Sequence, residues 1–184
     1  MHNFLKVLTL AAALCLGGNA QANVLTFNNP GLIEIDPVTN IATYTEAGFT
    51  IMGDAASFLP FADALLGFTG APISLKAVGL GPFALQSLER MFFDIGFDET
   101  PGDLLALGYF QGAPVAMQSF ALGAAFDLAA FGAAFANVTE VRFSASSAFL
   151  IDNVSANVPE PASIALVGVA LLGFSARRRL RQAA

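Results

Sequence analysis

Short runs of β-favouring residues, each closed by Gly, Pro, Asn or Asp, fill the middle of this chain and constrain its fold more than any other feature. In residues 138–143, apolar Val141 and Phe143 alternate with charged Glu140 and Arg142. A period of two is the pattern of a strand that buries one face and exposes the other. The pattern recurs along the chain, and it favours sheets over helices.

These runs predict an all-β fold. About nine strands of roughly four to eight residues fit into residues 23–157, and strands that alternate with long helical patterns are absent. Strand material is expected at residues 24–27, 32–35, 41–52, 73–78, 83–93, 104–111, 114–122, 138–143 and 148–154, with residues 41–52 as two strand pieces joined at a bulge or tight bend near Gly48. We therefore expect one domain of ordinary size, an antiparallel β-sandwich that is jelly-roll-like.

Three segments break the simple alternation. In residues 54–69 the phenylalanines and a leucine recur at spacings of three or four, which favours a short helical turn or a loop folded onto the sandwich. Residues 123–136 are rich in alanine, and either a short helix from near Asp127 or an irregular connection fits them. Between Leu85 and Leu88 the alternation slips by one residue, which predicts a bulge.

The C-terminal end, residues 158–184, combines three physically different pieces. A stiff, extended tether comes first, made of Val158, Pro159, Glu160 and Pro161. Residues 162–176 carry no charge, and as a helix they would span ~22 Å, which is short for a ~30 Å hydrocarbon core. The basic tail 177–184 supplies the missing reach, because arginine side chains extend to the headgroups. Its four arginines are Arg177, Arg178, Arg179 and Arg181. By the positive-inside tendency, a single transmembrane helix at 162–176 leaves the body outside.

This tripartite end resembles the PEP-CTERM protein-sorting signal of Gram-negative bacteria, with Pro159, Glu160 and Pro161 as the motif. The resemblance covers only the tail. It implies recognition by exosortase, a membrane-embedded cysteine peptidase-like enzyme, and cleavage near the motif. The alternative is an ordinary C-terminal membrane anchor, for which the predicted topology is the same.

The N-terminal end, residues 1–22, has the features of a secretory signal peptide. One lysine precedes an apolar stretch, and Ala20 and Ala22 form a small-x-small cleavage site. Export through the Sec translocon and cleavage by signal peptidase are therefore expected. A lipoprotein signal at Cys15 is the alternative, although Leu14 stands where such signals carry a small residue.

Composition excludes several kinds of chemistry from the body. Beyond the signal peptide there is neither histidine nor cysteine, so Ser-His-Asp and Cys-His catalysis and His/Cys zinc sites are excluded. The body also carries thirteen acidic and three basic side chains, a net charge of −10, which makes nucleic acid a poor partner. Carboxylates are the only acid–base groups left, and they could serve a glycosidase.

Calcium is the one cofactor that the sequence suggests, because it prefers oxygen ligands in irregular loops. One candidate set lies in an acidic loop, with Asp94, Asp98, Glu99 and Asp103. A second set would form if an early strand pairs beside the last one, and it comprises Glu46, Asp152 and Asn153. The alternative is that the loop is a solvated turn and that Asp152 and Asn153 bind nearby backbone.

The sequence therefore favours an exported, non-enzymatic protein that exosortase sorts. We expect an inner-membrane-anchored precursor with its body in the periplasm, and then a protein of the cell surface or of a biofilm matrix, with exopolysaccharide as a candidate partner. A carbohydrate-binding module on the same scaffold is the first alternative. A hydrolase that uses only carboxylates is the second.

Overall fold

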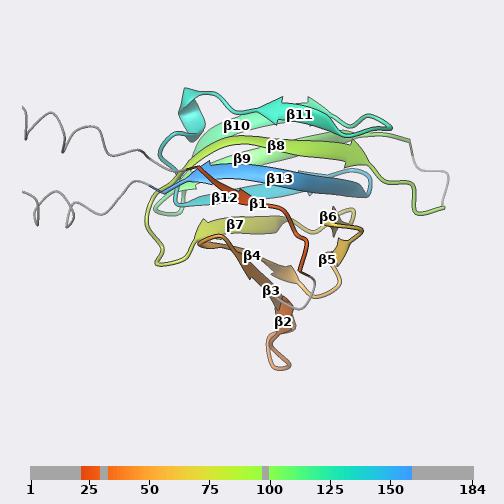
Figure 1. Cartoon of the computed structure of the whole chain (residues 1–184), viewed down its shortest axis with the longest axis horizontal. Coiled ribbons are helices and arrows are strands. Elements are labelled where there is room, and N and C mark those ends of the chain that lie inside the picture. Colours follow the sequence, from red (N-terminus) through yellow and green to blue (C-terminus); the bar gives the residue numbers. More distant parts are fainter. Residues whose placement is uncertain (1–21, 30–32, 97–99, 159–184) are drawn as a thin grey trace, which may run out of the picture. The chain divides into compact units, whose positions relative to one another are not determined.

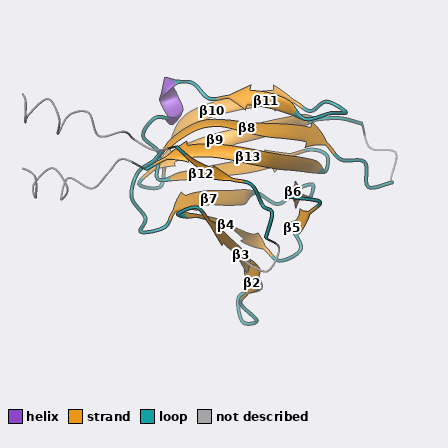
Figure 2. Cartoon of the chain, viewed as in Figure 1, coloured by secondary structure: helices purple, strands orange, loops and turns teal. Residues whose placement is uncertain are grey.

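The computed structural model describes residues 22–29, 33–96 and 100–158, and their strands form two antiparallel sheets (Figures 1 and 2). All of these strands lie in one compact unit, Gln21–Val158. The prediction of an antiparallel β-sandwich is confirmed. The predicted signal peptide, the motif at Pro159, Glu160 and Pro161, the helix at 162–176 and the basic tail lie outside the described residues. Within the described residues, no helix is long and apolar enough to span a membrane.

The first sheet has seven strands. Their spatial order is β10 (Ala113–Ala121), β9 (Asp103–Phe110), β12 (Glu140–Ala145), β7 (Ile73–Ala77), β4 (Phe49–Asp54), β3 (Ile41–Glu46) and β2 (Ile33–Ile35). Two of its hairpins have two-residue turns: β3–β4 turns at Ala47 and Gly48, and β9–β10 turns at Gln111 and Gly112. All four turn residues have positive φ, as a two-residue hairpin turn requires.

The second sheet has six strands. Their order is β11 (Asp127–Ala130), β8 (Ala84–Phe92), β13 (Phe149–Asn157), β6 (Ala64–Gly67) and β5 (Phe58–Phe61), and β1 (Asn23–Leu25) also pairs with β13. The first strand therefore lies beside the last one, but Glu46 lies on β3 in the other sheet.

The core fills the space between the two sheets, where alternate residues of strands such as β7 and β12 are buried. Phenylalanine dominates it. The fully buried phenylalanines are Phe27, Phe49, Phe58, Phe83, Phe135, Phe143 and Phe149. Burying one such ring stabilises the fold by roughly 1.5–3 kcal/mol before entropy is counted. The aromatic content of the chain thus serves packing.

Two sequence predictions are wrong. The described residues form thirteen strands, above the expected nine, mainly because β5, β6 and β11 lie in segments whose sequence shows no period of two. Residues 54–69 form strands β5 and β6, not a helical turn. They pair as a hairpin through Ala62 and Asp63, both at positive φ, and all four residues of β6 are buried, so neither strand shows the alternation that marks a half-buried strand.

The alanine-rich segment also differs from the predicted helix at Asp127. Asp127–Ala130 is strand β11, which pairs with β8, and helical structure is limited to the 3₁₀ turn η2 (Ala133–Phe135). Pairing with the free edge of β8 outweighs the helix propensity of alanine, because that propensity contributes only about 0.5 kcal/mol per residue.

The slip predicted between Leu85 and Leu88 is confirmed. Both side chains are buried although an even spacing would be expected on one face of a strand. Ser87 pairs with Ser155 and Leu85 with Ala156, so two steps along β8 match one step along β13. The extra residue in β8 keeps both leucines in the core.

Gly67 generates a stability prediction. It pairs with Phe149 across β6 and β13, and a Cβ at this position would overlap the Phe149 ring. We expect Gly67→Ala to lower the free energy of unfolding by about 1–3 kcal/mol, the usual cost of overpacking a core. Thermal unfolding measures the change. Gly132→Ala is the control, because Gly132 has φ −80° and open space around it, and equal losses in both variants would contradict the prediction.

Candidate functional site

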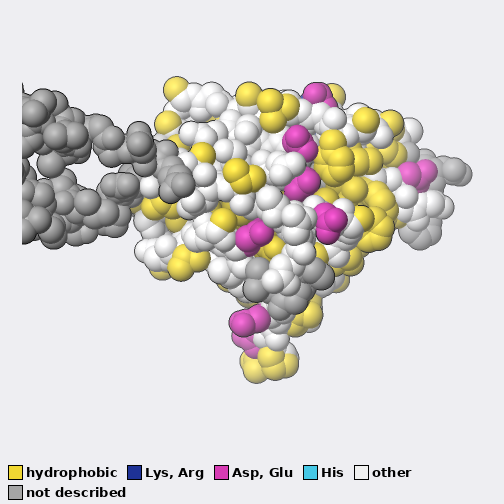
Figure 3. All heavy atoms as spheres, in the orientation of Figure 1, with side chains coloured by type: hydrophobic (Ala, Val, Ile, Leu, Met, Phe, Trp, Pro, Cys, Tyr) yellow, Lys and Arg dark blue, Asp and Glu magenta, His cyan; other side chains and the backbone are white. Residues whose placement is uncertain are grey.

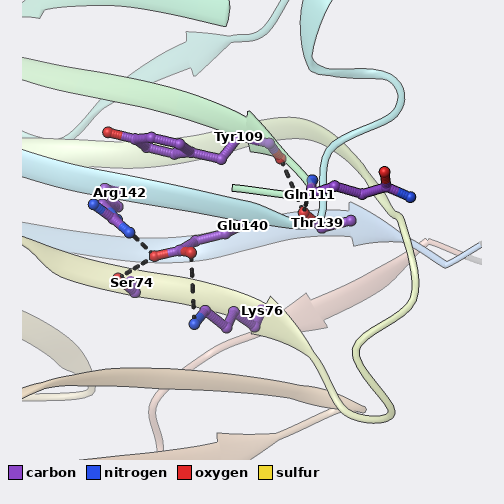
Figure 4. A network of polar contacts seen from close by, with 7 residues as sticks. All are labelled: Ser74, Lys76, Tyr109, Gln111, Thr139, Glu140 and Arg142. Atoms are coloured by element: carbon purple, nitrogen blue, oxygen red, sulfur yellow. Dashed lines mark hydrogen bonds and ion pairs between the residues drawn. The ribbon is translucent and has the colours of Figure 1, made fainter. Parts of the chain in front are cut away.

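A polar network on the outer face of the seven-stranded sheet is the most organised cluster of charged side chains in the described part (Figure 4). Ser74 and Lys76 come from β7, and Glu140 and Arg142 from the neighbouring β12. Each pair is spaced by two residues, so both members point to the same side of the sheet. Their inward neighbours, such as Val141, are buried.

Glu140 is the centre of this network. Its Oε1 accepts a hydrogen bond from Arg142 Nε at 2.6 Å and one from Ser74 Oγ at 2.8 Å, and Lys76 Nζ lies 3.5 Å from Oε2. The Glu140 side chain is only 13% exposed. Burial raises its pKa, but the hydrogen bonds from Arg142 and Ser74 and the two positive charges together hold the pKa below its usual value. Glu140 is therefore an ionised acceptor and is unsuited to act as a general acid.

Arg142 links the carboxylate to an aromatic ring. Its guanidinium carbon lies 4.4 Å from the centroid of the Tyr109 ring, within the range of a cation–π contact. The hydrogen bond from its Nε to Glu140 raises the Arg142 pKa further. Figure 4 shows the Tyr109 hydroxyl and the terminal nitrogens of Arg142 pointing to the same side, away from Glu140.

Thr139 ties the end of this network to the β9–β10 turn. Its N–H donates to the Tyr109 carbonyl at 2.7 Å, and its hydroxyl accepts from the Gln111 N–H at 3.0 Å (Figure 4). The network is thus held by backbone as well as side-chain contacts. It can bind and orient polar groups, but its one carboxylate cannot supply an acid–base pair.

The outer face of the six-stranded sheet is acidic instead (Figure 3). Glu89 on β8 pairs directly with Asp152 on β13, and Asn153 Nδ2 donates to Glu89 Oε2 at 3.0 Å. Burial raises the pKa of Asp152 above its usual value, the Asn153 N–H lowers it, and the charges of Glu89, Asp63 and Glu46 raise it again. Opposed like charges destabilise a sheet, and the Asn153 amide offsets part of that cost.

The second predicted calcium set is only partly brought together. Glu46 accepts hydrogen bonds from Thr26 N, Thr26 Oγ1, Phe27 N and Tyr44 Oη, at 2.9 to 3.3 Å. It therefore fixes the segment that follows β1. Its charge reaches Asp152, but the hydrogen bonds of Asp152 go to Asn153.

The first predicted set lies in the 92–103 connection, of which Asp98 and Glu99 are outside the described residues. Asp94 accepts from the Gly96 N–H at 2.8 Å, as in a turn, and Asp103 accepts from Ser119 Oγ at 3.1 Å. Residues 22–29, 33–96 and 100–158 contain no group of three His, Cys, Asp or Glu placed to hold a metal ion. Calcium binding stays a prediction from the sequence.

Sequence reasoning missed the Glu140 network. The alternation of residues 138–143 places Glu140 and Arg142 on one face, but nothing local indicates that β7 lies beside β12. Ser74 and Lys76 lie more than sixty residues away in the chain. The spacing of two in each segment was the available signal.

Comparison with known proteins identifies the C-terminal end. Residues 157–179 match the family model of the PEP-CTERM protein-sorting motif, which overlaps the predicted sequence Val158, Pro159, Glu160 and Pro161. No curated protein matches the chain.

Among solved structures, the chain is similar to CBM29_1, a family 29 carbohydrate binding module from Piromyces equi, with 13% identity, a TM-score of 0.49 and coverage of 76% of this chain and 92% of that one. It is also similar to a DUF4465 family protein from Bacteroides caccae ATCC 43185, with 11% identity, a TM-score of 0.45 and coverage of 69% and 85%. Neither likeness assigns a ligand to this chain.

Glu140→Gln tests the network. Because the pKa of Glu140 is lowered by folding, its contribution to stability is present above the unfolded pKa and is lost as the pH falls. We expect the variant to lose about 1 kcal/mol at pH 7, the net value of hydrogen bonds to a charged group in a partly exposed site. Urea unfolding at pH 7 and pH 3.5 measures it, and the loss should shrink at the lower pH. Glu34→Gln, an exposed change on β2 of the same sheet, is the control and should have little effect at either pH.

The calcium prediction is tested by thermal unfolding of residues 22–158 in chelator, in calcium chloride, and in sodium chloride of equal ionic strength. A bound ion at a hundredfold excess over Kd adds about 2.7 kcal/mol to stability. Calcium and sodium curves that coincide would mean that no site exists.

Asp152→Asn then locates the ion. In chelator at pH 7 the variant should melt higher than the wild type, because it removes a carboxylate whose pKa folding raises, and this gain should fade as the pH falls through the raised pKa and be gone below the ordinary value of 3.8. If Asp152 is a ligand, calcium stabilises the wild type and no longer stabilises the variant. Asp103→Asn asks the same of the first set.

Proposed function

Because this chain carries a PEP-CTERM protein-sorting motif at residues 157–179, we propose that it is an exported protein that exosortase processes and that acts at the cell surface or in an exopolysaccharide matrix. The precursor is held in the inner membrane by residues 162–176, with its body in the periplasm. The motif is the observation that carries this proposal. The body contributes a stable sandwich and no assembled catalytic site among the described residues.

The position of the motif relative to the fold supports processing. The last strand, β13, ends at Asn157, where the motif begins, and Val158 packs against the core. Pro159 then follows, and proline cannot continue a sheet ladder. The body keeps all of its described strands when the tail is removed, so cleavage beyond Val158 releases a complete sandwich.

The surface of the body suits an extracellular role rather than catalysis. Its only basic side chains, Lys76, Arg90 and Arg142, all pair with carboxylates. Exposed acidic side chains such as Glu34, Asp54 and Asp63 give the body a hydrated, negatively charged surface, which keeps it away from nucleic acid and other anionic partners.

A carbohydrate-binding module is the alternative. Saccharide platforms use exposed aromatic rings, but Tyr44 is buried in the core and the Arg142 guanidinium lies over the Tyr109 ring. The chain has no tryptophan. Binding of residues 22–158 to a glycan array would favour this alternative, and release of reducing sugar would favour the hydrolase.

The sorting proposal is tested by two variants of the full chain in a host that has exosortase. Replacing Pro159, Glu160 and Pro161 with alanine should leave the predicted helix intact and the protein in the inner membrane at precursor mass. Deleting residues 159–184 should leave the body outside the membrane fraction, because the described body has no spanning helix. Fractionation and immunoblotting measure both outcomes. Normal processing of the triple variant would show that exosortase does not read this motif.

A further inference from the structure

The free edges of the two sheets are protected unequally. An edge strand exposes unpaired N–H and C=O groups, and proteins shield such strands by making them short or by placing charge or proline on them. Strands β1 and β2 have three residues each, and β2 carries Glu34. Strand β5 has four residues and contains Pro60, and β11 has four residues and begins with Asp127.

Strand β10 has none of these protections over most of its length. It has nine residues and no charged side chain, and among the described residues it pairs only with β9. Pro114 and the register shift before Ala116 disturb its beginning. The run from Ala116 to Ala121 is regular.

The surroundings of β10 are also neutral and apolar. No charged residue occurs in residues 104–126, although the body as a whole has a net charge of −10. Met117 on this strand is 74% exposed. Val115 on the same strand, Phe126 just before β11 and Leu128 on β11 are also exposed. Figure 1 shows β10 and β11 along the same side of the sandwich, and Gln118 Nε2 donates to the Ala130 carbonyl of β11 at 3.0 Å.

We propose that β10 is a self-association edge: it pairs antiparallel with β10 of a second copy of this chain across a twofold axis, which joins two seven-stranded sheets into one. An antiparallel pair of identical strands is self-complementary, so each copy offers and receives the same surface. The inference goes beyond the proposed sorting and does not rest on it.

The distribution of charge on the body favours a second copy of this chain, rather than a basic partner, at the β10 edge. Two bodies of net charge −10 repel each other over most orientations, and the β10 edge is the face on which they approach with the least repulsion. The nearest carboxylate, Asp103, accepts a hydrogen bond from Ser119 Oγ. A basic partner would be drawn instead to the acidic faces elsewhere. Because repulsion between the bodies opposes pairing, salt should strengthen the dimer.

Sedimentation velocity of residues 22–158, which contain all the described strands, tests the proposal between about 1 and 200 µM, a range in which weak dimers are detected. The expected result is twice the monomer mass at high concentration, with tighter association in 0.5 M than in 0.05 M sodium chloride, values on either side of physiological screening. Met117→Glu should weaken the dimer by on the order of tenfold or more. Val38→Glu is the matched control, because Val38 is 90% exposed in the β2–β3 turn and receives the same charge; it should still dimerise.

A monomer at every concentration, or equal dimerisation of Met117→Glu and the wild type, would overturn the proposal and leave the edge to another polypeptide. Circular dichroism and melting temperature verify that each variant is folded. A mixture of Met117→Glu and Met117→Lys should recover association that neither variant has alone. Failure of the mixture to associate would also count against antiparallel pairing centred near Met117.

Discussion

The structure depends on strand β13, the last strand of the chain that it describes. This strand pairs with β8 along most of its length, with β6 through residues 149–151 and with β1 through residues 154–156. Its inward side chains Phe149, Ile151 and Val154 are buried. The six-stranded sheet cannot form without β13, because β1, β6 and β8 all pair with it. Formation of this sheet therefore requires contacts between residues that are distant in sequence, and such contacts form slowly.

The imbalance of charge is the second constraint on the body. Its three basic side chains serve two carboxylates: Lys76 and Arg142 bind Glu140, and Arg90 binds Asp127. The other acidic residues must be satisfied by water, by backbone N–H groups or by neutral side chains, as Glu46 is by Thr26 and Tyr44. Asp36 shows how: hydrogen bonds from the backbone of Val38 and from Thr39 lower its pKa. Acidic side chains are thus placed at turns and on the outer face of β8 and β13. The neutral stretch of residues 104–126, which includes most of β9 and all of β10, is the exception.

The sequence predicted the fold where the alternation of apolar and polar residues is visible within a single strand. Residues 138–143 alternate cleanly, and β12 buries Val141 and Phe143 as expected. The slip between Leu85 and Leu88 was visible because both leucines had to reach the core. The prediction for residues 54–69 was wrong for a physical reason. Ala62 and Asp63 form the turn at positive φ, but neither is glycine or asparagine, so no local signal marked the turn. The Glu140 network could not be predicted, since it depends on which strands are neighbours.

The β10 and β11 side of the sandwich shows why an edge can stay open without unfolding. Arg90 is 7% exposed, its Nη1 donates to the Asp127 carbonyl at 2.8 Å, and its guanidinium carbon lies 5.2 Å from the centroid of the Phe120 ring. Its Nε has no hydrogen-bond partner in the described part of the chain, which is a cost that aliphatic packing would not carry. In return, Arg90 fixes β11 against β8, and Phe120, Phe131 and Phe135 pack edge to face beside it. These contacts hold both edge strands from within. The outer side of β10 is therefore not needed for the stability of one copy, and its backbone groups are free to pair with another strand.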